Sequence, residues 1–180
     1  MVSADKSGVL GIWDLNQGQL IRAIKTHKGA ASRVSFEPKL GLIFSAGLND
    51  GSLACLDMRT NQGVYKEMLH KGATTDLKVD GKYVITSSAD HTVNVCEIPE
   101  FRSISKADIK DMAFAIEQAH GTIVVGTSGG NIVATDLQSG KILYGYGVMK
   151  KGECRLLGMN KNCSRLVCAG EDDSPSLLTF

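Results

Sequence analysis

The 180-residue sequence has no long apolar run and no recognisable leader. A membrane-spanning helix needs roughly 18 or more consecutive apolar residues, and no stretch of this chain approaches that length. The opening residues, MVSADKSG, lack the basic stretch followed by an apolar one that marks a secretion signal. We therefore expect neither membrane insertion nor secretion, and we expect the chain in the cytoplasm or the nucleus.

A strong charge of either sign is also missing. The sequence has 20 Lys and Arg residues against 19 Asp and Glu, which leaves a formal net charge of +1 at pH 7. A field this weak does not attract nucleic acid or an anionic membrane surface over long distances. We expect neither as a partner, so other proteins or peptides are the expected ligands.

Proline is scarce, with three residues, and the sequence has five cysteines. The cysteines are odd in number, form no C-x-x-C pair and have no histidine near them in sequence, so neither a zinc site nor a disulfide framework is indicated. Buried thiols in a reducing compartment are the simpler interpretation, and we expect no metal and no cofactor. The five positions are Cys55, Cys96, Cys154, Cys163 and Cys168.

A repeat of about 40 residues is the main positive signal. The stretch 8–15, GVLGIWDL, is an alternating apolar run behind a glycine, and it contains the pair Trp13-Asp14. Equivalent positions recur in steps of 43, 40, 39 and 44 residues. The repeats therefore end near Asp14, Asp57, Glu97, Asp136 and Phe180.

Short runs of strand-like composition lie within each repeat, separated by turn signals about every 8–12 residues. The pattern is typical of all-β sandwiches and propellers, and we expect one domain over residues 1–180. The predicted strands are 2–4, 9–15, 19–25, 33–37, 42–46, 52–58, 64–69, 74–79, 82–87, 92–98, 122–127, 131–137, 141–146, 154–159, 165–169 and a last one that ends at Phe180.

Residues 106–120 fit two patterns. Ile109, Met112 and Ile116 have helical spacing. However, Phe114 also alternates with Met112 and Ile116, as in a strand. The 39-residue step between the repeat ends on either side leaves no room for an inserted helix, so we predict one strand here, the innermost of its blade.

The repeat spacing and these motifs resemble the WD-repeat family of β-propellers, in divergent form, over essentially the whole chain. The resemblance implies four-stranded antiparallel blades, about four to five blades' worth, with three complete blades between two partial ones. This is fewer than the six to eight blades common in the family. We therefore expect an incomplete ring, with the chain the C-terminal part of a longer propeller or with the ring completed by another chain or by self-association.

The resemblance also implies a hydrogen-bonded network of His, Ser or Thr, Asp and Trp in each blade. One repeat supplies His27, Ser45 and Asp50, and the next supplies His70, Asp90 and either Thr86 or Ser88. The opening repeat keeps Trp13-Asp14, whereas Leu56, Cys96, Thr135 and Thr179 replace the Trp elsewhere. The last two repeats lack the histidine, and Asp108 and Lys151 lie near its expected place.

Catalytic motifs are not evident. The glycines of residues 126–131, GTSGGN, lack the Lys and the following helix of a P-loop, and no nucleophile elbow is present. The histidines His27 and His70 recur 43 residues apart in equivalent loops, which favours a structural hydrogen bond over catalysis. We expect no catalytic, cofactor-binding or metal-binding residues.

The best candidates for partner binding are charged residues in loops and turns that the family places on one rim. We expect a non-catalytic scaffold or adaptor in a multiprotein complex, with Tyr144 and Tyr146 as anchors or as packing residues. The alternatives are a propeller-type hydrolase with its active site in missing blades, or a substrate receptor of a ubiquitin ligase. The candidate rim consists of Lys28, Lys71, His91, Lys150, Lys151, Asp172 and Asp173.

Overall fold

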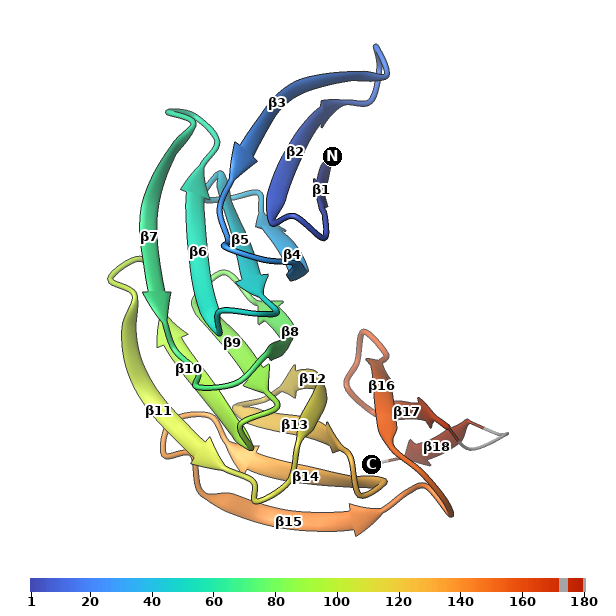
Figure 1. Ribbon diagram of the computed structural model, residues 1–180. Helices are drawn as coiled ribbons and strands as arrows, with labels where there is room; N and C mark the ends of the chain where they lie inside the picture. Colours follow the sequence, from blue (N-terminus) through green and yellow to red (C-terminus); the bar gives the residue numbers. More distant parts are fainter. Residues whose placement is uncertain (172–174, 180) are drawn as a thin grey trace.

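The computed structural model describes residues 1–171 and 175–179, and its regular secondary structure there is entirely β-strand. Five antiparallel sheets follow one another along a curved arc (Figure 1). The fold is an incomplete β-propeller in which each sheet is a blade, so the predicted all-β class is confirmed. Within these residues there is no helix that could cross a membrane.

Three of the sheets have four strands, and neighbours in each sheet are consecutive in the chain. The second sheet contains β4 (Ala31–Glu37), β5 (Leu42–Gly47), β6 (Ser52–Asp57) and β7 (Gln62–Met68). The third contains β8 (Thr74–Val79), β9 (Tyr83–Ser88), β10 (Thr92–Glu97) and β11 (Arg102–Asp108). The fourth contains β12 (Ala113–Ala119), β13 (Thr122–Thr127), β14 (Asn131–Asp136) and β15 (Ile142–Gly147).

The first and fifth sheets have three described strands each. The first contains β1 (Val2–Ala4), β2 (Val9–Asp14) and β3 (Gln19–Lys25). The fifth contains β16 (Cys154–Met159), β17 (Arg165–Gly170) and β18 (Ser176–Thr179). This arrangement of three full and two partial blades agrees with the prediction.

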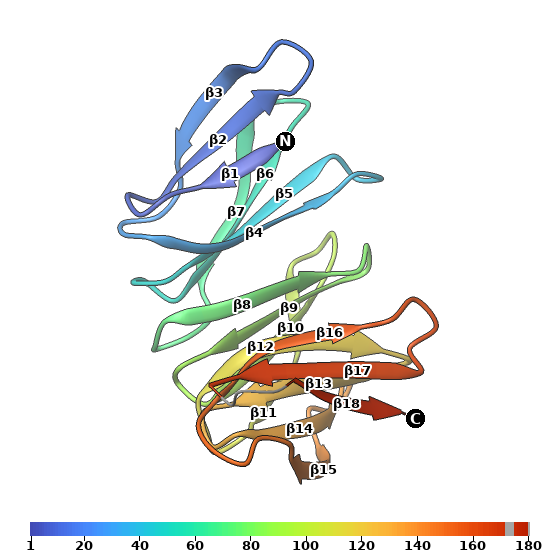
Figure 2. The same ribbon diagram turned by 90° about the vertical axis from the view of Figure 1, so that its right-hand side faces the viewer.

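How deeply a strand is buried depends on whether it is an inner, central or outer strand of its sheet. The strands β4, β8, β12 and β16 line the concave side of the arc, whereas β3, β7, β11 and β15 lie outside (Figures 1 and 2). The central strands β5 and β6 are buried at every residue because a neighbouring sheet covers each face. They accordingly read as nearly continuous apolar runs, LIFSAG and SLACLD. The outer strand β7 is mostly exposed and mostly polar.

Four apolar clusters fill the spaces between successive sheets. Leu10 and Ile43 join the first sheet to the second, and Phe44 belongs to the cluster between the second and the third. Val93 and Ile116 belong to the cluster between the third and fourth sheets, and a further cluster joins the fourth to the fifth. Burial between neighbouring sheets is therefore the main source of stability.

The prediction that residues 106–120 form no helix and supply the innermost strand of a blade is confirmed by β12, but the predicted bounds of that strand are wrong. The structure divides this stretch among the end of β11, a loop at residues 109–112 and β12. The outer strand β11 was not predicted. The apolar residues had helical spacing because Ile109 is a loop residue that is buried with the β12 residues Ala113 and Ile116 in one cluster. Their spacing therefore does not reflect a helix.

The two ends of the strands form two opposite rims. The loop rim comprises the inter-sheet loops 26–30, 69–73, 109–112 and 148–153 and the turns 5–8, 48–51, 89–91 and 128–130. The hairpin rim comprises the turns 15–18, 38–41, 58–61, 80–82, 98–101, 120–121, 137–141 and 160–164. Because adjacent strands are antiparallel, each strand joins one rim to the other.

Candidate functional site

A chain of hydrogen bonds crosses the loop rim at His27. The imidazole Nε2 lies 2.8 Å from the Ser45 hydroxyl, and Nδ1 lies 2.8 Å from the Ser52 hydroxyl. Ser52 in turn donates to Asp50 at 2.7 Å, and the other carboxylate oxygen accepts from the Lys28 backbone N–H at 3.2 Å. The loop before β4 is thereby fixed to β5 and to the turn that precedes β6.

The next blade repeats this arrangement around His70. Its Nε2 lies 2.8 Å from the Thr86 hydroxyl, and its Nδ1 lies 2.9 Å from that of Thr92. Thr92 donates to Asp90 at 2.6 Å, and Asp90 accepts from the Lys71 N–H at 2.8 Å. The histidines are almost inaccessible, with 1% of His27 and 2% of His70 exposed.

In each chain of hydrogen bonds, the carboxylate determines which groups donate and which accept, because it can only accept. Because Thr92 gives its proton to Asp90, its oxygen accepts from Nδ1–H of His70, which leaves Nε2 to accept from Thr86. Burial lowers the pKa of His70 to about 4, against the attraction of Asp90, so the ring is neutral at pH 7. Burial also lowers the pKa of His27.

The turn carboxylates remain charged. Burial by itself raises the pKa of Asp50, but hydrogen bonds from Ser52 and from backbone N–H groups outweigh it and bring the pKa to about 2. The same balance, with Thr92 as the main donor, brings the pKa of Asp90 to about 2. A neutral imidazole and an anionic carboxylate, joined through a hydroxyl, are thus the stable protonation states at neutral pH.

Sequence reasoning missed the hydroxyls that join each histidine to its aspartate. Ser52 and Thr92 lie between the partners, and the direct distance from Nδ1 to the carboxylate is 3.5 Å for His27 and 3.4 Å for His70. The signal was present, because both follow their turn residue in equivalent positions 40 residues apart. Ser88 does not contact His70; its hydroxyl accepts from the Asp90 N–H at 3.0 Å.

Ile109 and Met149 occupy the histidine position in the fourth and fifth blades. Each donates its backbone N–H, at 2.9 Å, to the carbonyl of the turn residue before the third strand of the preceding sheet, as His70 does at 3.1 Å. Asp108 and Lys151, which we expected nearest to this place, lie beside it. Val125 is the fourth residue of β13, where β5 has Ser45 and β9 has Thr86, so the polar pair is replaced by an apolar one.

The fourth blade makes the same loop-to-turn connection with the roles exchanged. Asp111 lies in the loop, and its carboxylate accepts from the Ser128 hydroxyl and, at 2.8 Å, from the Gly129 N–H in the turn. In the two preceding blades the carboxylate lies in the turn and the N–H lies in the loop. Thr135 is fully buried in this blade, and its hydroxyl has no partner among the described residues.

Trp13 and Asp14 make separate contacts in the first sheet. The indole Nε1 donates to the Ser3 hydroxyl at 2.8 Å. Asp14 accepts from the backbone N–H groups of Asn16 and Gln17, at 2.8 and 3.2 Å, and so stabilises the turn to β3. Neither residue contacts the chain of hydrogen bonds at His27, which belongs to the second sheet.

A β-bulge interrupts each of the four innermost strands at the same place. The pairing skips Ser32 in β4, Thr75 in β8, Phe114 in β12 and Arg155 in β16. A bulge turns its side chain out of the regular alternation. All four bulged residues line a cavity of about 860 Å³ on the concave side of the arc. Residues far apart in sequence thus meet at one place, close to the loop rim.

Apolar and cationic groups dominate the lining of this cavity. The Arg155 guanidinium lies over the Phe114 ring, 5.1 Å from its centroid. Arg33 pairs with Asp76 at 2.9 Å, and Asp76 also accepts from the Ile116 N–H at 3.0 Å. These contacts join four successive sheets, the second to the fifth, and orient the basic side chains at the cavity.

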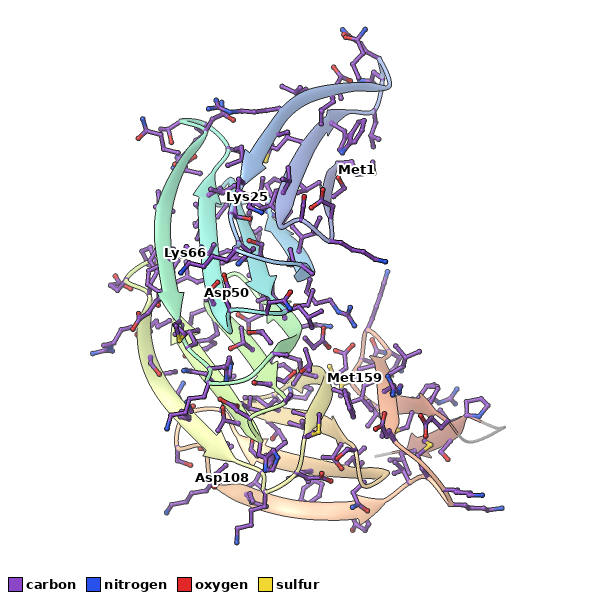
Figure 3. All side chains as sticks on the ribbon, viewed as in Figure 1. Met1, Lys25, Asp50, Lys66, Asp108 and Met159 are labelled. Carbon is purple, nitrogen blue, oxygen red and sulfur yellow. The ribbon has the colours of Figure 1, made fainter. Side chains whose placement is uncertain are left out.

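The predicted partner-binding residues that the structure describes lie on the loop rim, but none of them lines this cavity. Lys28, Lys71, His91, Lys150 and Lys151 are all exposed. Asp172 and Asp173 lie outside the described residues. Figure 3 shows Lys66 reaching from β7 toward Asp50, and its ammonium lies 3.9 Å from that carboxylate. Tyr144 and Tyr146 are exposed on the outer strand β15, away from the cavity.

No group of three or more His, Cys, Asp or Glu side chains that could hold a metal ion occurs in residues 1–171 and 175–179. The carboxylates of Asp50, Asp90 and Asp111 on the loop rim instead accept hydrogen bonds from backbone N–H groups and hydroxyls. In chemical terms the rim can recognise a partner by apolar contact, by cation–π contact and by charge.

No known protein family matches this chain in a scan of family sequence patterns. Its fold, in contrast, is common among solved structures, since 1400 chains match it. One is the computationally designed Ika8 protein, with a TM-score of 0.88 and 20% identity over 99% of this chain and 55% of that one. Another belongs to a mitotic checkpoint complex, with a TM-score of 0.89 and 12% identity over 99% of this chain and 58% of that one.

These similarities concern the fold. At such low identities they support the propeller architecture and carry no site residue from one chain to another. This chain spans little more than half the length of either match.

Proposed function

We propose that this chain is a divergent WD-repeat protein that acts as a non-catalytic scaffold, binding a protein partner at the loop rim over the concave cavity. The convergence of the four bulged side chains on that cavity is the observation that carries the proposal. A regular strand would not place all four there. Exposed polar and aromatic side chains on loops held by a rigid scaffold are the usual means of recognition.

The properties of the two buried histidines support a structural role for them and for the polar groups that they bind. His27 and His70 are buried, have lowered pKa values and use both ring nitrogens within the fold. Membership of a multiprotein complex fits this proposal, since the chain is similar in fold to a chain of a mitotic checkpoint complex. A reducing location, cytoplasmic or nuclear, fits the five free cysteines, of which four are buried.

The test is affinity purification with quantitative mass spectrometry, comparing the unaltered chain with two variants. Phe114→Ala and Arg155→Glu change the cavity, whereas Arg22→Glu reverses an exposed charge on the outer strand β3 and serves as the control. A partner that is lost with both cavity variants and kept with the control supports the proposal. Partners that are unaffected by either cavity variant would overturn it, as would a catalysed reaction that depends on these residues.

A further inference from the structure

Four turns of the hairpin rim contain a residue with left-handed backbone geometry at the same place. Gly18, Asn61, Phe101 and Gly140 have φ angles of 64°, 57°, 56° and 66°. They recur in steps of 43, 40 and 39 residues, so they belong to equivalent turns between the last two strands of the first four sheets. Glycine and asparagine tolerate this geometry, whereas a bulky side chain is disfavoured by steric crowding.

Phe101 is therefore the exception that needs a reason. Its ring stacks on Tyr65 of the preceding sheet, with centroids 4.6 Å apart and planes at 11°, and lies 6.2 Å from the Phe44 ring. The strained turn thus places an aromatic ring over the space between the second and third sheets. In the equivalent turns glycine or asparagine leaves that space without such a cover.

A cavity of about 300 Å³ lies directly beside this ring. Its apolar wall comes from Leu40 and Leu42 of one turn and strand, Val64 of β7, and Pro99 and Phe101 of the next sheet. The Val64 side chain is 48% exposed although it lines the cavity, so the apolar wall is open to solvent. A single bulky apolar side chain of a partner could insert between the two sheets here.

Two cationic side chains flank the opening. The Arg59 guanidinium holds Asp57 through Nε at 3.1 Å and Nη2 at 2.7 Å, yet 75% of its side chain is exposed and its other N–H donors remain available. The Lys39 ammonium has no partner among the described residues, since Glu37 accepts only the Lys39 backbone N–H. The lining therefore carries two positive charges against one carboxylate that is already paired.

We propose that this cavity on the hairpin rim binds a peptide segment in which a bulky apolar side chain stands next to an acidic residue. The apolar side chain packs against Phe101 and Val64, and the carboxylate pairs with Lys39 and the free edge of Arg59. Charge complementarity selects an acidic segment rather than a basic one. This surface lies on the rim opposite to the loop rim, so the chain could hold two partners at once.

Fluorescence anisotropy with the full 180-residue chain tests this directly. The probes are labelled heptapeptides with a central Leu, Ile, Phe or Trp flanked by Asp, compared with the same peptides flanked by Lys and with a central Ala. The chain variants are Phe101→Gly, which suits the left-handed backbone, and Lys39→Glu, an exposed charge reversal. Arg22→Glu, an exposed charge reversal on the outer strand β3, is the matched control, and melting curves verify that each variant is folded.

We expect at least one acidic probe to bind, with affinity lowered tenfold or more by Phe101→Gly and by Lys39→Glu and unchanged by Arg22→Glu. The Lys39→Glu chain should gain affinity for the Lys-flanked probe. Equal binding of acidic and basic probes, binding that survives both variants, or no binding at millimolar peptide would each overturn the proposal. Since Phe101→Gly and Lys39→Glu leave the loop rim unaltered, failure here leaves the proposed function standing.

Discussion

The buried histidines His27 and His70 make the stability of the fold depend on pH. Burial lowers the pKa of His70 from 6.5 to about 4, so between these values the unfolded chain binds a proton that the folded chain does not. The free energy of unfolding therefore falls as the pH decreases from 6.5 toward 4, by on the order of 3 kcal/mol for this residue. The lowered pKa of His27 acts in the same direction. The carboxylates of Asp50 and Asp90 add a further loss only below about pH 4.

Urea denaturation at several pH values between 7 and 4.5 measures this dependence. His70→Ala should cost about 1–3 kcal/mol at pH 7, because Thr86 and Thr92 lose their partner, and it should also flatten the pH dependence. A chain whose stability is constant over this range, or a variant with the same slope as the unaltered chain, would contradict the assignment.

Two buried threonines offer a comparison in which the same substitution has opposite effects. Thr86 and Thr135 are both fully buried, but only Thr86 has a hydrogen-bond partner, His70. Thr86→Val should destabilise the fold by about 1–3 kcal/mol, because it leaves the imidazole Nε2 unpaired. Thr135→Val should be neutral or stabilising, because it removes an unpaired buried hydroxyl. Thermal melting of the two variants tests this difference. Equal losses of stability in both variants would show that the Thr135 hydroxyl is paired.

At the scale of the single element, the turns before β2, β6, β10 and β14 allow a sharper prediction. His91 has a φ of 70°, at the place where the other turns have Gly8, Gly51 and Gly130. Relief of left-handed strain in His91→Gly should raise stability by about 1 kcal/mol. If His91 also contacts a partner, the same variant should bind more weakly while melting at a higher temperature. A lowered melting temperature would show that the imidazole has stabilising contacts.

The sequence predicted strands well where both the period and the glycine turns were clear. Strands such as β5, β6 and β9 were recognised because a strand buried on both faces is an apolar run, and the turn residues on either side mark its ends. The outer strand β11 was missed because exposed edge strands need no apolar pattern, and RSISKAD has little of one. The bulges in the innermost strands were also missed, since one extra residue leaves no compositional mark.

For the candidate site, the sequence indicated which histidines and aspartates belong together but not how they connect. The repeat fixed the spacing of His27 and Asp50, whereas the intervening Ser52 required knowledge of the turn geometry. The concave cavity was beyond sequence reasoning, because its lining residues come from five strands and the adjoining turns and loops and meet only through the curvature of the arc.

At the scale of the whole molecule, the last sheet presents an uncovered apolar face. Leu156, Val167 and Leu177 are 61%, 43% and 59% exposed, and they lie on the same face according to the strand register. Exposed apolar patches of this kind mark contact surfaces. We expect the isolated 180-residue chain to sediment as more than a monomer. Val167→Ser with Leu177→Ser should restore a monomer, whereas Ile142→Ser with Leu143→Ser on β15 should not. A monomer at high concentration for the unaltered chain would refute this.

The four apolar clusters between successive sheets have a consequence for how the molecule comes apart. Each sheet is stabilised by its immediate neighbours alone, so the arc resembles a one-dimensional lattice with nearest-neighbour coupling. The end sheets have one such neighbour among the described residues and the middle ones have two. Local opening should therefore propagate inward like fraying. Amide hydrogen exchange followed by mass spectrometry should show the slowest exchange in β9 and β10, with protection decreasing toward both ends.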